Sequence, residues 1–323
     1  MEKLDKGFKD ENFNISSLFY ADDGMIFAKS IKEAEEVINE TIRISRKYGL
    51  EINKRKCQIL IYNMKEKPES IRDIEVNSKF KYLGITINDT KNCFKEQKKK
   101  MLEKARKLAN MIYPIIKQSC SKIIIGKTLW KSIALPSVLF GASVIDMTKQ
   151  EIEQLQRIEN SVYRTILGSP TYTQRTTLRG EIGAASMKAR ILESQWKYLN
   201  YCMNEGNDLL RRIVEVTRDE KKNRWMRGLE KYLEALGVKN GILEKTNEEI
   251  RIIMKEWDNR EWKKEMNTKE SLNIYREWRT ERGNQEHVYD KRPSSVILFK
   301  CRTNNQNLND RKRFKSEDEK CDL

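Results

Sequence analysis

Histidine is almost absent from this chain, whose 323 residues include only His287. Six cysteines are scattered along the sequence without any C-x-x-C spacing, which favours reduced thiols over a disulfide framework. A single histidine leaves little material for a Ser-His-Asp triad, a Cys-His pair or a complete His-rich zinc site. The sequence therefore argues against nucleophile–histidine catalysis and against a disulfide-rich fold.

Long apolar runs are also missing. The stretch "IALPSVLFGASVI" (133–145) contains a proline and is too short to span a bilayer. Because no signal peptide is evident either, we expect an intracellular protein, cytoplasmic or nuclear, without a membrane partner. Charge is abundant instead: 64 Lys and Arg against 48 Asp and Glu give a net charge of +16. This excess favours a polyanionic partner, nucleic acid before a membrane surface.

Two acidic residues, Asp22 and Asp23, lie between apolar runs in "SLFYADDGMIFAKS" (17–30). We expect two strands, "ISSLFY" and "MIFAK", joined by a tight turn for which the Asp-Asp-Gly sequence is suited. Neighbouring carboxylates repel each other and apolar strands desolvate them, so the pair is costly unless a cation neutralises it. Mg²⁺ is commonly bound by one or two carboxylates plus substrate phosphates. The alternative is an exposed turn without a role, which is the commoner situation for an isolated Asp-Asp pair.

The flanking sequence predicts an α+β domain. Ser30 and Glu33 form a capping box that opens a helix over 31–48, which Gly49 ends. Strands are expected at 57–63 and 80–87. Residues 1–90 therefore indicate a sheet with a helix packed behind it.

Helical periodicity begins at about residue 94. A helix over 94–118, bent or ended near Pro114, is followed by one that Thr148 and Glu151 cap and by one over about 185–203. Beyond Gly206 the chain is charged and helical with interspersed tryptophans, which either stack on bases or, more commonly, belong to the core. The segment from about Gly283 to Leu323 is predicted to be poorly ordered. The basic residues of the first helix are either a solvated face or a phosphate-binding surface; they are Lys98, Lys99, Lys100, Lys104, Arg106 and Lys107.

Taken in order, "FYADD", a helix, "YGLEINKRKCQILIYN" (48–63) and "FKYLGITIN" (80–88) resemble the palm of reverse transcriptases. The segments "LWKSIALPSVLFGASV", "RIENSVYRTILGSP" and "LRGEIGAASMKARILESQWKYLNYCM" resemble non-LTR (LINE-type) retrotransposon enzymes. The resemblance implies a C-terminal part of such an enzyme: a partial right-hand palm at 1–90, a thumb-like helical domain at 91–205 and a basic helical region at 206–323.

The resemblance also implies roles for particular residues. Asp22 would be the main ligand of Mg²⁺ or Mn²⁺ and Asp23 its auxiliary, in two-metal nucleotidyl transfer by an RNA-directed DNA polymerase. Its partners would be an RNA template, a DNA primer and deoxynucleoside triphosphates. The basic helix at 94–118 corresponds to the first thumb helix. Lys56 would protonate the departing pyrophosphate, unless it is a surface lysine on a strand edge. The turn known as the primer grip corresponds to Tyr82, Leu83 and Gly84.

Some family features have no counterpart in the sequence. An intact polymerase needs a further aspartate from an earlier palm strand and a fingers domain, but "MEKLDKGFKDENFNI" (1–15) contains nothing that resembles "FxDxxxAFD". We therefore expect a fragment that is inactive alone. Cys321 either begins a Cys/His zinc motif or is a free thiol. The competing hypothesis is a non-catalytic nucleic-acid-binding protein, a decayed element or a copy retained by the host.

Overall fold

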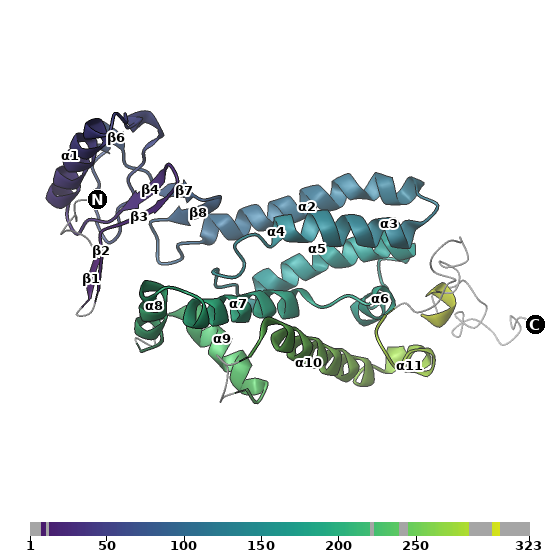
Figure 1. Cartoon of the computed structure of the whole chain (residues 1–323). Helices are drawn as coiled ribbons and strands as arrows, with labels where there is room; N and C mark the ends of the chain where they lie inside the picture. The colour runs from purple at the N-terminus through teal and green to yellow at the C-terminus, as the bar shows by residue number, and fades with distance from the viewer. Residues whose placement is uncertain (1–7, 11–12, 220–222, 239–244, 284–298, 304–323) are drawn as a thin grey trace, which may run out of the picture. The chain divides into compact units, whose positions relative to one another are not determined.

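The computed structural model describes residues 8–10, 13–219, 223–238, 245–283 and 299–303 (Figure 1). The chain divides into two compact units, Met1–Lys100 and Met101–Leu323. Helices predominate and are accompanied by small antiparallel sheets, which agrees with the expected α+β class. The division at residues 90 and 205 stays a prediction. Within the described ranges, no helix is long and apolar enough to cross a membrane.

The strands of the first unit form four separate antiparallel hairpins rather than one palm sheet, as far as the described residues show. The predicted strand at 57–63 is wrong: this segment makes only an isolated bridge between Ile59 and Val76. The predicted strand at 80–87 is two strands, because the backbone reverses at Leu83 and Gly84. The pairs are β1 (Phe8–Asp10) with β2 (Phe13–Ile15), β3 (Ser17–Tyr20) with β4 (Asp23–Ile26), β5 (Ser70–Ile71) with β6 (Ile74–Glu75), and β7 (Lys79–Tyr82) with β8 (Ile85–Asn88).

Helix α1 (Ile31–Lys47) begins at the predicted N-cap, Ser30, but the reciprocal bond of the predicted capping box goes to the preceding residue, Lys29, instead of to Ser30. The Glu33 amide donates to Ser30 Oγ over 3.1 Å, and the Glu33 carboxylate accepts from the Lys29 amide over 2.7 Å. Gly49, with φ +68°, follows the helix in the left-handed conformation that glycine tolerates. Helix α1 lies against β5, and its packing behind the hairpin of Asp22 and Asp23 stays a prediction. The turn η1 (Lys54–Lys56) follows it.

Helix α2 (Lys95–Gln118) begins in the first unit and continues into the second, passing through Pro114. The π-helical segment η2 (Trp130–Ala134) precedes Pro136, which has no N–H to donate, and the Leu135 amide reaches back to the Trp130 carbonyl. The remaining elements are α3 (Lys122–Leu129), α4 (Leu135–Val138), α5 (Lys149–Leu167), α6 (Arg175–Ile182), α7 (Met187–Asn204), α8 (Asp208–Asp219), α9 (Arg224–Ala235), α10 (Asn247–Asn267), η3 (Glu270–Leu272) and α11 (Asn273–Trp278).

Tryptophans form much of the core of the second unit, as expected. Trp196 packs with Met226 and Met254 between α7, α9 and α10, and Trp262 is fully buried where its indole N–H donates to the Thr176 carbonyl over 2.8 Å. Trp278 differs from these, because 62% of its surface is exposed. Burial of the indole rings explains why the charged helices α7 to α10 pack together.

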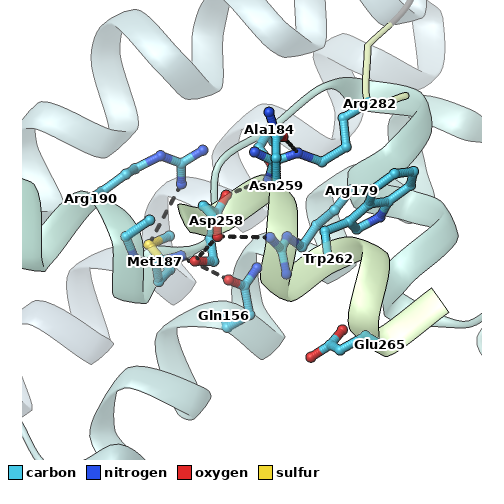
Figure 2. Close-up of polar contacts among 12 residues, drawn as sticks. Gln156, Arg179, Ala184, Met187, Arg190, Asp258, Asn259, Trp262, Glu265 and Arg282 are labelled. Atoms are coloured by element: carbon cyan, nitrogen blue, oxygen red, sulfur yellow. Dashed lines mark hydrogen bonds and ion pairs between the residues drawn. The ribbon is translucent and has the colours of Figure 1, made fainter. Parts of the chain in front are cut away.

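A buried carboxylate, Asp258, connects α10 to α6 and α7 (Figure 2). It accepts hydrogen bonds from Ser186 Oγ at 2.6 Å and from Arg179 Nη2 at 3.0 Å, and it pairs with Arg282. Burial alone would raise the pKa of Asp258, but the guanidinium groups of Arg179 and Arg282 together with the Ser186 hydrogen bond outweigh burial and lower that pKa.

Two further buried carboxylates are satisfied in the same way. Glu159 on α5 accepts from Trp130 Nε1 at 3.0 Å and from Arg190 Nη1 at 2.6 Å. Glu181 on α6 accepts from Arg279 Nε at 3.0 Å and from the Tyr275 hydroxyl at 3.1 Å. Because each buried acid has an arginine partner, these groups fix how the helices pack.

The C-terminal segment departs in part from prediction. Residues 299–302 are helical, Phe299 is fully buried, and Arg302 lies 3.6 Å from Glu181. The prediction of poor order from about Gly283 is therefore wrong for these residues, because an apolar ring and an ion pair tie them to the helices. Residues 284–298 and 304–323, with His287 and Cys321, lie outside the described residues.

Replacing Asp258 with asparagine should lower the free energy of unfolding by about 3–5 kcal/mol at pH 7, because it leaves two buried guanidinium groups without their anion. Since the folded-state pKa is lowered, this contribution is present above about pH 4 and is lost as pH falls through the folded-state value. Denaturant unfolding at pH 7 and below pH 4 measures it. Asp208→Asn, at an exposed carboxylate on α8, is the control and should change stability little; an equal effect of both variants would contradict the assignment.

Candidate metal and nucleic-acid site

The hairpin β3–β4 presents Asp22 and Asp23 at its tip, as predicted. Tyr20 pairs with Asp23 across the strands, which leaves Ala21 and Asp22 as the two turn residues. The positive φ of 53° is at Ala21, so the turn is Ala-Asp and not Asp-Asp-Gly as expected. A two-residue turn holds the neighbouring carboxylates at one end of the hairpin.

Gly24 has a different role from the predicted one. It lies within β4 opposite Phe19, and a Cβ atom placed on it would be 2.5 Å from Cε1 of the Phe19 ring. The glycine therefore allows the aromatic ring to lie across the neighbouring strand, a cross-strand packing that stabilises two-stranded sheets. Gly24 is therefore not needed for the backbone conformation of the turn, which is formed by Ala21 and Asp22.

The two carboxylates are accessible rather than desolvated. Asp22 and Asp23 are exposed, and so are Leu18, Phe19 and Tyr20 beside them. Neither carboxylate forms a hydrogen bond or ion pair with another described residue. Within the described ranges, no group of three or more His, Cys, Asp or Glu could hold a metal ion. The donor set is thus two adjacent carboxylates, which fits a hard cation that takes its other ligands from water and phosphate.

The hairpin β7–β8, which contains the predicted primer-grip residues, turns at Leu83 and Gly84. Both have positive φ, 45° and 84°, as a two-residue turn of this kind requires. This conformation is strained for leucine, whose side chain is 40% exposed. Phe80 and Tyr82 lie on one face of β7 with ring centroids 6.0 Å apart. Of the predicted primer-grip residues, Leu83 and Gly84 thus form an exposed tip, and Tyr82 is half-buried at the end of β7, where its ring stacks on Phe80.

Hydrogen bonds connect β8 to the first turns of α2. The Thr86 amide donates to Gln97 Oε1 over 3.0 Å, and Lys100 Nζ donates to Thr86 Oγ1 over 2.7 Å. One turn earlier on the helix, the Glu96 amide donates to Asn88 Oδ1 over 3.2 Å. The β7–β8 hairpin and the start of the basic helix therefore form one connected structure within the first unit. Sequence reasoning missed this junction, because a buried Thr and Asn on a short strand have no distinctive pattern.

Two lysines of the predicted basic surface are engaged within the protein: one is buried, and the other donates a hydrogen bond. Lys98 is only 3% exposed, which corrects its assignment to the nucleic-acid surface: it precedes Met101 by three residues and so lies on the buried face of α2. The Lys100 ammonium is bound to Thr86. The predicted residues that remain exposed are Lys99, Lys100, Lys104, Arg106 and Lys107, although the Lys100 ammonium is engaged by Thr86.

Lys56 lies in the turn η1 and is exposed, so it is not on a strand edge as the alternative supposed. No hydrogen bond or ion pair joins it to Asp22 or Asp23. Its neighbour Lys54 is the residue that makes contacts, donating to the Arg72 carbonyl over 3.1 Å and pairing with Asp73 over 3.0 Å. The catalytic role of Lys56 stays a prediction.

The sequence contains one further indication of a basic surface, a long stretch without acidic residues. Residues 104–145 contain seven Lys and Arg and no Asp or Glu, although the chain has 48 acidic residues. This stretch covers most of α2 together with α3, η2 and α4. A surface formed by these elements has positive charge that no carboxylate of the same stretch neutralises.

Comparison with known proteins supports a relation to polymerases. Residues 1–87 match the family model described as reverse transcriptase (RNA-dependent DNA polymerase), a range that contains both hairpins up to Ile87. An uncharacterized transposon-derived protein of Caenorhabditis elegans is 24% identical over 172 residues, which cover 50% of this chain and 60% of that protein. The chain thus spans about 60% of the relative's length. No solved structure matches.

Proposed function

We propose that this chain is the palm and thumb portion of a non-LTR (LINE-type) retrotransposon reverse transcriptase, which works inside the cell on an RNA template and a DNA primer. The observation that carries the proposal is the hairpin tip that presents Asp22 and Asp23, inside the range that the reverse transcriptase family model matches. The transposon-derived relative supports the retrotransposon origin.

The tips of the hairpins β3–β4 and β7–β8 are both exposed, so that a metal ion and a primer could reach them. Asp22 and Asp23 would hold Mg²⁺ or Mn²⁺, which when bound neutralises charge on the triphosphate of the incoming nucleotide. The exposed turn of Leu83 and Gly84 would position the primer end, since glycine allows close approach of the backbone. Lys56 would donate a proton to pyrophosphate. The β8–α2 junction would keep the primer-positioning turn in register with the basic helix.

A second candidate, nucleic-acid binding without catalysis, is favoured by one observation. Residues 91–131 carry twelve Lys and Arg against two Glu, a net charge of +10 out of the chain's +16. Such a surface attracts phosphates whether or not a complete catalytic site is present. The two candidates make different predictions for primer extension.

We expect negligible primer extension by this chain alone with Mg²⁺ and deoxynucleoside triphosphates, because one carboxylate pair does not position two metal ions. Fusion to the fingers and first palm strands of an active enzyme of the same class should produce extension. Asp22→Ala should abolish it, and Asp208→Asn, at an exposed carboxylate of α8, should not. Gel-resolved extension of a labelled primer on RNA measures this.

Processive synthesis by the unfused chain, lost on Asp22→Ala, would show that the proposed incompleteness of the site is wrong. A fused protein whose activity is the same with and without Asp22 would contradict the metal-ligand role. A fused protein that is inactive but binds nucleic acid would favour the second candidate.

Binding should depend steeply on salt. Dissociation constants on the order of 10⁻⁴–10⁻⁶ M are expected at physiological salt with weak sequence preference, since no base-reading motif is visible. Lys104→Gln combined with Lys107→Gln should reduce the slope of log affinity against log salt by about 2, roughly 1 for each lost phosphate contact. Fluorescence anisotropy with an RNA–DNA duplex measures the slope.

The matched control is Lys263→Gln with Lys264→Gln, two exposed lysines on α10. Because "RKRFK" (311–315) is also basic, both pairs are compared in a chain that ends at Thr303, which retains the buried Phe299. An unchanged slope for the α2 pair would remove α2 from the binding surface.

A further inference from the structure

Strands β7 and β8 are short and pair only with each other among the described residues. Each has four residues, and together they form a two-stranded sheet. A hairpin of this size has little stability of its own in water, so its orientation depends on what it packs against. The turn at Leu83 and Gly84 therefore keeps a fixed orientation only if another part of the chain holds the strands.

The segment that begins α2 covers the outer edge of β8. In an antiparallel pair, amides of alternate residues on one strand point to the same edge. The Thr86 amide donates to Gln97 Oε1 over 3.0 Å, and the Asn88 amide donates to the Cys93 carbonyl over 2.7 Å. Residues 93–97 thus provide the acceptors that a third strand would provide in a larger sheet.

The helix receives a hydrogen bond from the strand in return. The Glu96 amide lies in the first turn of α2, where an amide has no acceptor within the helix. It donates to Asn88 Oδ1 over 3.2 Å. One side chain of the helix, Gln97, therefore completes the backbone bonding of β8, and one side chain of β8, Asn88, completes that of the helix. Gln97 and Asn88 are only 7% and 9% exposed, so water does not readily replace either bond.

Thr86 connects this exchange to the turn. It lies two residues beyond Gly84, it is 2% exposed, and its hydroxyl accepts from Lys100 Nζ over 2.7 Å while its amide donates to Gln97. Both polar groups of one buried strand residue are thus held by the first turns of α2. The turn cannot rotate relative to these turns of the helix without breaking the bonds and leaving a buried amide unpaired, which is costly.

We propose that Gln97 and Asn88 are positioning residues, which hold the turn at Leu83 and Gly84 in the orientation that receives the primer end. This inference rests on the proposed function, in which that turn contacts the primer. It divides the work of α2 between two sets of residues. Gln97, which is neutral and buried, determines where the primer end lies, whereas the exposed basic residues determine how tightly the duplex binds.

The test uses the full chain and an RNA–DNA duplex whose primer strand ends in 4-thiothymidine, a photoreactive base. Irradiation at a protein concentration that saturates the duplex should attach this base mainly to residues 82–85, as located by mass spectrometry. Gln97→Met keeps the size of the side chain and removes the acceptor, so it should lower the crosslink yield at least about fivefold. Affinity for the duplex, measured by anisotropy, should stay within about twofold because no charge changes.

Conservative replacements separate positioning from packing. Gln97→Glu keeps an acceptor for the Thr86 amide and should retain most of the crosslink, and Gln154→Met, at an exposed residue of α5, is the matched control. Asn88→Ala should lower the yield and Asn88→Asp should not, which gives a second pair if Gln97→Met does not fold. Circular dichroism checks folding, and hydrogen exchange at the Thr86 amide should be at least about tenfold faster in Gln97→Met.

Three results would overturn the proposal, and they differ in what else they overturn. An unchanged crosslink in folded Gln97→Met and Asn88→Ala would show that these side chains do not position the turn, while the proposed function would stand. Equal losses in Gln97→Met and Gln97→Glu would assign the effect to packing and not to the acceptor. A wild-type chain that binds the duplex but crosslinks outside residues 82–85 would contradict the primer contact of the proposed function itself.

Discussion

Two-residue turns determine where both candidate site elements lie. A turn this short forces left-handed dihedrals on its residues, and here they fall on Ala21, Leu83 and Gly84. In return it leaves no loop into which the tip side chains can fold back. The carboxylates of Asp22 and Asp23 are therefore exposed and adjacent without a protein partner among the described residues, and the turn at Leu83 and Gly84 is also exposed. Strain in a non-glycine residue at such a tip is characteristic of functional sites.

Charge is arranged differently in the two units. In the second unit the buried acids Glu159, Glu181 and Asp258 are each neutralised by arginine. These ion pairs connect neighbouring helices. In the first unit the acids at the hairpin tip have no counter-ion among the described residues, and α2, which continues into the second unit, carries exposed basic residues. The hairpin acids are therefore available to a cation, whereas the paired acids of the second unit hold helices together.

Local rules predicted the features that depend on neighbours in sequence. The hairpin, the cap at Ser30 and the capping box at Thr148 were predictable, because each is set by a few consecutive residues. The role of Gly24 was not, because it is set by the Phe19 ring on the opposite strand. Burial of Lys98 was missed for a related reason: five of the six basic residues assigned to α2 are exposed, and only the register of the helix separates Lys98 from them.

The central claim is that the tip of the β3–β4 hairpin binds a divalent cation. Iron-mediated backbone cleavage tests it directly, since Fe²⁺ that replaces Mg²⁺ generates hydroxyl radicals which cut the chain beside the metal. With Fe²⁺, ascorbate and a nucleic-acid duplex, mass spectrometry should locate the main cut near Tyr20–Gly24, and excess Mg²⁺ or Asp22→Ala should suppress it. Cleavage that is spread evenly along the chain, or that persists at full strength in Asp22→Ala, would contradict the account.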